Sequence, residues 1–212
     1  MLVEWLQADG HTAEYQWLRW EPSIVPLIKS IKSRLKRKSN IPLEEVADSR
    51  KAQEDIAHTK WDNIKEKLFA SGIFKRLWLY YATKDYYRAY KKAIRSWNAD
   101  YIVMDRYILD FIIDQSLNYD ANPNEFAKRI EGTPVGQMRK PDLSILIDIP
   151  AEVGYQRKLD GTPLEYLKAR RDCYLQTPFL ENTLHVNGNE SVEKIHNTIR
   201  NWVNEHQPGI SS

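Results

Sequence analysis

The order of apolar stretches along the chain restricts the possible folds more than any other feature. Three short apolar runs, at residues 101–104, 142–149 and 182–187, are each followed by a segment whose apolar residues have helical spacing. Strands that alternate with helices predict a mainly parallel sheet with helices on both faces. The uninterrupted apolar character of the strands predicts burial on both faces of that sheet. We therefore predict an α/β fold with a doubly wound, mainly parallel sheet.

The rest of the chain predicts further elements of the same domain. Residues 2–9 have a short helical pattern, and residues 12–20 are rich in strand-forming residues. The pattern of residues 24–60 predicts a basic amphipathic helix followed by a mobile polar insertion. The pattern of residues 61–97 predicts a long helix with a break near Ser71. The pattern contains no internal repeat and no linker rich in proline or serine. Residues 1–212 are therefore predicted to form a single domain.

Composition excludes several classes of protein. The 31 basic and 29 acidic side chains give a net charge of +2, which is no general signal for nucleic acid or membrane. No stretch approaches the ~18 apolar residues of a membrane span, and the first residues do not resemble a secretory signal. The lone Cys173 allows no disulfide within the chain and fits a reducing compartment. These features predict a cytoplasmic protein.

The glycines carry a further restriction. The chain has only eight, and none of them is followed by lysine. No Gly-x-x-x-x-Gly-Lys phosphate loop therefore occurs in this sequence.

Charged side chains stand at the predicted carboxyl ends of the strands, where ligands of such sheets bind. Arg19 follows the first strand, and Asp105 and Arg106 follow the second. The carboxylate of Asp105 could hold a metal-bound water, and the guanidinium of Arg106 could hold phosphate oxygens with two parallel hydrogen bonds. A structural ion pair or a helix cap would explain the same two residues equally well.

The local sequence here resembles a known family. Asp105-Arg106-Tyr107 resembles the Asp-Arg-Tyr motif of thymidylate kinases and related nucleotide kinases. Arg19-Trp20-Glu21-Pro22 is similar to the family's Arg-Glu-Pro element, with one residue inserted. Other segments resemble the fourth strand, the lid, the helix after the lid, and the last strand with its helix; they are residues 140–150, 152–158, 165–174 and 186–195. The resemblance covers most of the chain apart from roughly residues 24–60.

This resemblance implies a transfer of the γ-phosphate of ATP, with magnesium, to a nucleoside monophosphate or a similar small acceptor. Asp105 would lie near the magnesium and the transferred phosphate, whereas Arg19 and Arg106 would hold the phosphate of the acceptor. Residues 151–176 would form a lid. Its arginines would close on the phosphates, unless they only cover a solvated helix face; they are Arg157, Arg170 and Arg171.

The residues that would bind the acceptor base depart from the family pattern. Tyr81 stands where the family places the aromatic residue that stacks on the base. Four residues later, where thymidylate kinases have an arginine, this chain has Asp85, flanked by Lys84 and Arg88 as substitutes. This departure argues against thymidylate itself as the acceptor.

The front of the chain departs further. The family begins with a strand and a glycine-rich phosphate loop, and the resemblance places that strand between residues 101–104 and 142–149. Neither is found in this sequence. The resemblance therefore predicts two unpaired strand edges and an N-terminally truncated kinase, and it is compatible with a homodimer.

Two other functions stay open. The chain could be a degenerate or truncated kinase fold that binds nucleotides without activating ATP. It could also be a binding module, because residues 29–38 hold six basic side chains and no acidic one and could contact anionic lipid or nucleic acid. Nearby acidic residues balance this charge, which makes nucleic acid the less favoured partner.

Overall fold

A computed structural model describes residues 1–24, 69–157, 161–176 and 183–206. The predicted basic helix and insertion at residues 24–60 lie outside this part of the chain, except for Ile24. No helix within the described residues is long and apolar enough to cross a membrane.

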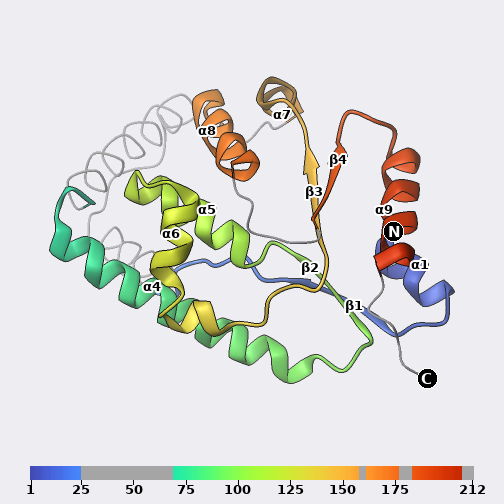
Figure 1. Cartoon of the computed structure of the whole chain (residues 1–212), viewed down its shortest axis with the longest axis horizontal. Helices are drawn as coiled ribbons and strands as arrows, with labels where there is room; N and C mark the ends of the chain where they lie inside the picture. Colours follow the sequence, from blue (N-terminus) through green and yellow to red (C-terminus); the bar gives the residue numbers. More distant parts are fainter. Residues whose placement is uncertain (25–68, 158–160, 177–182, 207–212) are drawn as a thin grey trace, which may run out of the picture.

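The strands form two parallel pairs (Figure 1). β1 (Ala13–Trp17) pairs with β2 (Tyr101–Asp105), and β3 (Ser144–Asp148) pairs with β4 (Thr183–Asn187). The predicted α/β class with parallel strands and helices on both sides is confirmed. In the described part of the chain, however, the pairs make two separate sheets instead of one continuous sheet.

This division explains why one prediction about burial is wrong. No residue of β2 or β3 is fully buried, although both sequences are almost continuously apolar. Each of the two strands is paired along one edge only among the described residues. A strand without neighbours on both sides leaves part of its backbone and of its side chains accessible.

The larger core lies on the side of β1 and β2. It joins α4 (Gly72–Ala93), α5 (Ile108–Tyr119) and α6 (Pro123–Ile130) through buried residues such as Tyr86, Phe111 and Phe126. The ring of Tyr86 stacks on Phe111 with centroids 5.0 Å apart, and its hydroxyl donates to the carbonyl oxygen of Leu18 at 2.9 Å. Burial raises the pKa of Tyr86. This contact fixes the end of β1 against α4.

Local signals explain where these helices begin. The predicted break near Ser71 is confirmed, because Ser71 is the N-cap of α4 and its side chain accepts a hydrogen bond from the amide of Phe74. α6 begins with Pro123 after the N-cap Asn122. The sequence did not lead us to expect α6, nor the short 3₁₀ helix η2 (Pro134–Gln137) that follows it; a second 3₁₀ turn, η1 (Ile94–Ser96), extends α4.

The smaller core covers β3 and β4. α1 (Leu2–Ala8) and α9 (Val192–His206) lie side by side there (Figure 1), and Leu2 and Trp5 of α1 pack against the cluster of Val186, Ile199 and Val203. The first helix of the chain is therefore docked next to the last.

The predicted lid region contains two helices instead of one. α7 (Ala151–Arg157) and α8 (Leu164–Leu175) are separated by Gly161, whose φ of +76° favours glycine, and by Pro163 at the N-cap of α8. The helical pattern that follows β3 is therefore interrupted at Gly161 and Pro163. α8 has no buried residue.

Candidate functional site

The end of β2 carries the predicted Asp-Arg pair in a constrained conformation. Arg106 has a φ of +69°, which lies in the left-handed region that residues other than glycine rarely adopt. Such a conformation costs on the order of 1–3 kcal/mol, and residues of this kind concentrate at functional sites. Asp105 accepts a hydrogen bond from the hydroxyl of Tyr15 at 3.0 Å, and its other oxygen lies 3.9 Å from Nε of Arg106.

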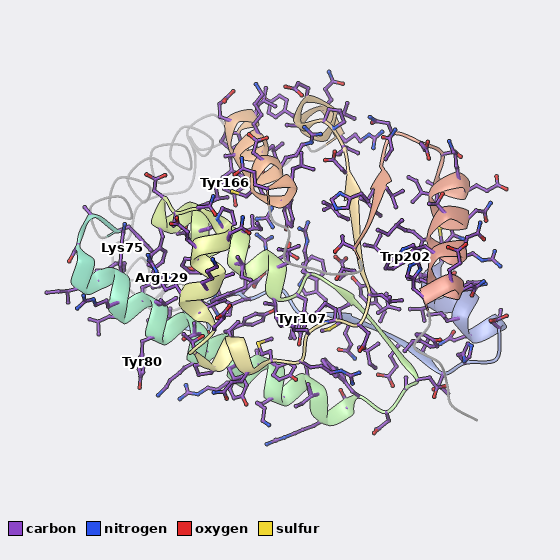
Figure 2. The ribbon with its side chains drawn as sticks, viewed as in Figure 1. Lys75, Tyr80, Tyr107, Arg129, Tyr166 and Trp202 are labelled. Carbon is purple, nitrogen blue, oxygen red and sulfur yellow. The ribbon has the colours of Figure 1, made fainter. Side chains whose placement is uncertain are left out.

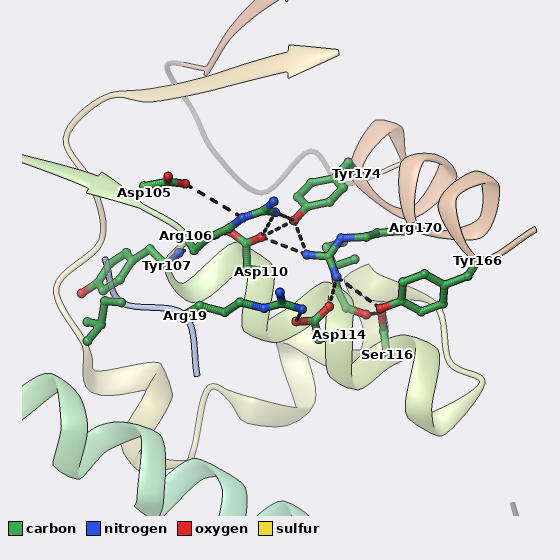
Figure 3. Close-up of polar contacts among 12 residues, drawn as sticks. Arg19, Asp105, Arg106, Tyr107, Asp110, Asp114, Ser116, Tyr166, Arg170 and Tyr174 are labelled. Carbon is green, nitrogen blue, oxygen red and sulfur yellow. Dashed lines mark hydrogen bonds and ion pairs between the residues drawn. The ribbon is translucent and has the colours of Figure 1, made fainter. Parts of the chain in front are cut away.

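Three arginines from separate parts of the chain meet beside this turn (Figure 3). They contact two carboxylates that lie one turn apart on α5, and we call the group the arginine–aspartate cluster; its members are Arg19, Arg106, Arg170, Asp110 and Asp114. Arg106 and Arg170 donate to Oδ1 of Asp110 at 2.7 and 3.0 Å. Arg170 also donates to Asp114, whose second oxygen accepts from Arg19 at 3.4 Å.

Tyr174 of α8 completes the cluster. Its hydroxyl donates to Asp110 and accepts from Arg170 at 3.0 Å. Burial, together with the negative charge of Asp110, raises the pKa of Tyr174 to about 12, so that the hydroxyl stays protonated at neutral pH. Burial alone would lower the pKa of Arg106, but the hydrogen bond and charge of Asp110 raise it above its ordinary value. The guanidinium therefore remains charged.

The exposed fractions of the cluster's side chains show which of them a ligand could reach. The side chains of Arg170 and Asp110 are each 12% exposed, whereas those of Arg19 and Arg106 are 39% and 38% exposed. Arg170 is enclosed by protein groups. Arg19 and Arg106 present part of their donor groups to solvent, where an anionic ligand could reach them.

The other two predicted lid arginines lie elsewhere. Arg171 forms two parallel hydrogen bonds of 2.7 Å with Asp148 at the end of β3, and this contact lowers the pKa of Asp148. Arg157 donates to the carbonyl oxygen of Gly188 at 3.4 Å. A cavity of about 320 Å³ opens beyond β3 and β4, and Asp148, Arg171 and Asn187 are among its lining residues. Of the three predicted lid arginines, Arg170 thus lies in the arginine–aspartate cluster, whereas Arg157 and Arg171 lie near the ends of β3 and β4.

Tyr81, the predicted base-binding residue, and Asp85, which stands where the family has an arginine, are engaged in structural contacts. Asp85 is buried and accepts hydrogen bonds from Nε1 of Trp20 at 3.1 Å and from the amide and hydroxyl of Ser23 at 3.0 and 2.7 Å. Burial would raise the pKa of Asp85, but these hydrogen bonds outweigh it and lower the pKa. The hydroxyl of Tyr81 lies 3.2 Å from that of Ser23. Asp85 and Tyr81 thus hold the segment after β1 against α4.

Neither of the expected substitutes for the family's arginine contacts the cluster. The ammonium of Lys84 lies 4.2 Å from the centre of the Tyr80 ring and donates to its hydroxyl. Tyr80 is largely exposed on α4 (Figure 2), and Arg88 is exposed on the same helix. In the described part of the chain, Lys84 and Arg88 form no hydrogen bond or ion pair with the arginine–aspartate cluster.

Sequence reasoning missed Asp110, Asp114 and Tyr174. The signal for the two carboxylates was present, because residues four apart on a helix share one face and these two interrupt an otherwise apolar segment. They follow directly after the Asp105-Arg106 pair in the sequence. Nothing comparable distinguishes Tyr174 among the twelve tyrosines of the chain.

Parallel strands and arginines that converge beyond a strand end are typical of α/β proteins that bind phosphate groups. The family model for thymidylate kinase matches residues 62–199, which is more than half of the chain. A thymidylate kinase of Buchnera aphidicola subsp. Acyrthosiphon pisum (strain APS) is 28% identical over 201 residues, which cover 82% of this chain and 88% of that protein. The chain belongs to the thymidylate kinase family, and this membership supports a role as a nucleotide kinase.

Proposed function

We propose that the protein transfers the γ-phosphate of ATP to a nucleoside monophosphate or a similar small acceptor, whose phosphate is held by Arg19 and Arg106. The observation that carries this proposal is the convergence of these arginines at the end of β2, with Arg106 in a strained backbone conformation. In this conformation the guanidinium of Arg106 donates to Asp110 of the cluster. Arg19 and Arg106 also keep enough exposure to receive a ligand.

These arginines would supply the part of the chemistry that concerns the acceptor phosphate. In phosphoryl transfer, an enzyme mainly positions the reacting phosphates and neutralises the charge that develops on them. Arg106 and Arg19 would orient the acceptor phosphate, and Arg170 would add positive charge from α8. In this proposal Arg157 and Arg171 lie toward the donor nucleotide, because both stand at the ends of β3 and β4, where the cavity opens.

Asp105 fits a magnesium ion. Mg²⁺ is commonly held by one or two carboxylates together with substrate phosphates and water, and the side chain of Asp105 is 49% exposed at the end of β2. When bound there, the ion would neutralise phosphate charge. Within the described residues no group of three or more His, Cys, Asp and Glu side chains could hold a metal by itself, so the remaining ligands would have to be phosphate oxygens and water.

The acceptor is proposed to differ from thymidylate. Asp85 is buried and engaged by Trp20 and Ser23, so the position where the family has an arginine offers no cation to a ligand. A cytoplasmic location and a homodimer stay predictions.

A second candidate function is nucleotide binding without phosphate transfer. The sequence favours it because no Gly-x-x-x-x-Gly-Lys loop is available to hold the phosphates of ATP. We suggest a phosphotransfer assay with a panel of nucleoside monophosphates, ATP and magnesium, performed on this chain and on a version extended upstream. Activity in either form would support the kinase. Binding of monophosphates without transfer by both forms would support the second candidate.

Equilibrium binding of ATP, with and without magnesium, completes that test. The kinase requires that ATP bind to the form that transfers phosphate. Binding of neither ATP nor any nucleoside monophosphate would refute both functions.

A further inference from the structure

α8 is attached to the rest of the protein in an unusual way. None of its residues is fully buried, so burial of apolar side chains, which normally holds a surface helix in place, contributes little here. Ionic contacts connect it to three neighbouring elements instead. Arg170 reaches Asp110 and Asp114 on α5, Arg171 reaches Asp148 at the end of β3, and Lys168 lies 3.6 Å from Glu152 on α7.

These contacts differ in strength. The side chains of Asp110 and Asp114 are 12% and 18% exposed, and that of Arg170 is 12% exposed. Charged hydrogen bonds with little contact to water are screened weakly by solvent and by salt. The contact of Lys168 with Glu152 is largely exposed, and such surface pairs contribute little. Arg170 with its two carboxylates, supported by the hydroxyl of Tyr174 on Asp110, therefore attaches α8 to α5.

The same carboxylates also accept hydrogen bonds from the two arginines that the proposed function assigns to the acceptor phosphate. Asp110 accepts from Arg106, and Asp114 accepts from Arg19. A carboxylate and a phosphate offer similar pairs of oxygens to a guanidinium. Asp110 and Asp114 thus take positions on the arginines that an incoming phosphate would need, and their negative charges would repel it.

We propose that Asp110 and Asp114 form a latch that holds α8 against α5 through Arg170 when no acceptor is bound, and that competes with the acceptor phosphate for Arg19 and Arg106. The identity of the ligand rests on the proposed function, whereas the attachment of α8 does not. When the acceptor phosphate binds, it takes donors of Arg19 and Arg106 from the two aspartates. Competition with the two aspartates therefore lowers the affinity of the protein for the acceptor.

The test replaces each carboxylate by the amide of equal shape. Asp110→Asn and Asp114→Asn remove the negative charge and keep one acceptor oxygen for the bonds to Oδ1 of each residue. The amide nitrogen that replaces Oδ2 cannot accept the bond from the amide of Tyr107 to Asp110 or the bond from Arg19 to Asp114. Asp142→Asn is the matched control, because Asp142 pairs with Arg139 at 3.1 Å on the exposed surface. Two readouts are needed: hydrogen exchange of residues 164–175, and calorimetric titration with a panel of nucleoside monophosphates.

We expect amide exchange in α8 to become about tenfold faster in Asp110→Asn and Asp114→Asn, because a charged contact is lost. We also expect each variant to bind the nucleoside monophosphate about tenfold more tightly than the wild type, whereas Asp142→Asn changes neither quantity. Unchanged exchange in both variants would overturn the latch. Weaker binding of the ligand would overturn the competition, because it would show that the carboxylates support the arginines.

The two proposals can fail separately. Faster exchange in α8, with no binding of any nucleoside monophosphate by any of the proteins, would uphold the latch and refute the proposed function.

Discussion

Replacement of Asp85 tests whether this position is structural. Asp85 is buried and accepts three hydrogen bonds of 2.7–3.1 Å from Trp20 and Ser23. In Asp85→Ala the indole N–H of Trp20, which packs between Trp78 and Phe111, loses its acceptor. A buried donor left without a partner costs about 1–3 kcal/mol. Ser23 is exposed, so water can replace most of its lost contacts.

The expected decrease in the free energy of unfolding is therefore about 2–4 kcal/mol, with the loss at Trp20 as the largest part and the weakened contacts of Ser23 as the remainder. For a chain of this size that decrease lowers the melting temperature by roughly 5–15 °C. Asp85→Arg, which introduces the residue found in thymidylate kinases, should be destabilising as well, because an arginine cannot accept any of these hydrogen bonds.

The assay is urea denaturation at pH 7, with Asp142→Ala as the exposed control. A double-mutant cycle with Trp20→Phe should give a coupling free energy of at least about 1 kcal/mol, because the two side chains bond directly. The lowered pKa of Asp85 adds a pH test. The stabilisation by Asp85 is fully present above the ordinary aspartate pKa of 3.8 and is lost as the pH falls through the lower pKa of the folded state. A loss of less than about 0.5 kcal/mol in Asp85→Ala would refute the structural role.

Three further predictions concern stability. In Arg171→Met, stability should fall at pH 7, and its difference from the wild type should shrink as the pH drops below about 4. Arg171 lowers the pKa of Asp148 from 3.8, and protonation of Asp148 removes their contact. Thermal melts at several pH values measure this difference in stability, and a difference independent of pH would contradict the prediction. Gly136→Ala should lower the free energy of unfolding by about 1–3 kcal/mol, because its Cβ would lie 2.2 Å from the backbone oxygen of Glu131. The control Gly132→Ala should lower it far less, because a Cβ at Gly132 meets nothing within 4 Å. Equal urea midpoints for the two variants would refute this prediction. Tyr86→Phe should lose about 1 kcal/mol by urea denaturation, because the carbonyl of Leu18 loses its buried donor; a more stable variant would contradict it.

The strands could be predicted from sequence because each signal is local. β2 and β3 are short apolar runs ended by Asp105 and by Pro150, and both were found within a residue or two of the predicted bounds. The division into two sheets could not be predicted from such runs, because pairing depends on which strands meet in space. α6 was missed because its eight residues, Pro123–Ile130, offer few apolar positions in a mostly polar sequence.

The site could be predicted only in part for the same reason. Arg106 and Arg170 were identified from the resemblance, and the structure places both in one cluster. Their partners Asp110 and Asp114 share one face of α5, a signal that the sequence offered, but the sequence alone does not show that this face meets Arg19 and Arg170. Trp20 was recognised as an inserted residue, but its hydrogen bond to Asp85 joins residues 65 positions apart, and no local pattern reports such a contact.

Titration of this chain, of Arg106→Met and of Arg106→Lys with a panel of nucleoside monophosphates shows whether Arg106 holds the phosphate of the acceptor. We predict saturable binding to the wild type. A charged hydrogen bond contributes about 1.5–3 kcal/mol, so the affinity of Arg106→Met for the nucleoside monophosphate should be roughly 10- to 100-fold lower. Arg106→Lys should bind with intermediate affinity, because lysine keeps the charge without the planar guanidinium. Equal affinity of the wild type and Arg106→Met would contradict the account.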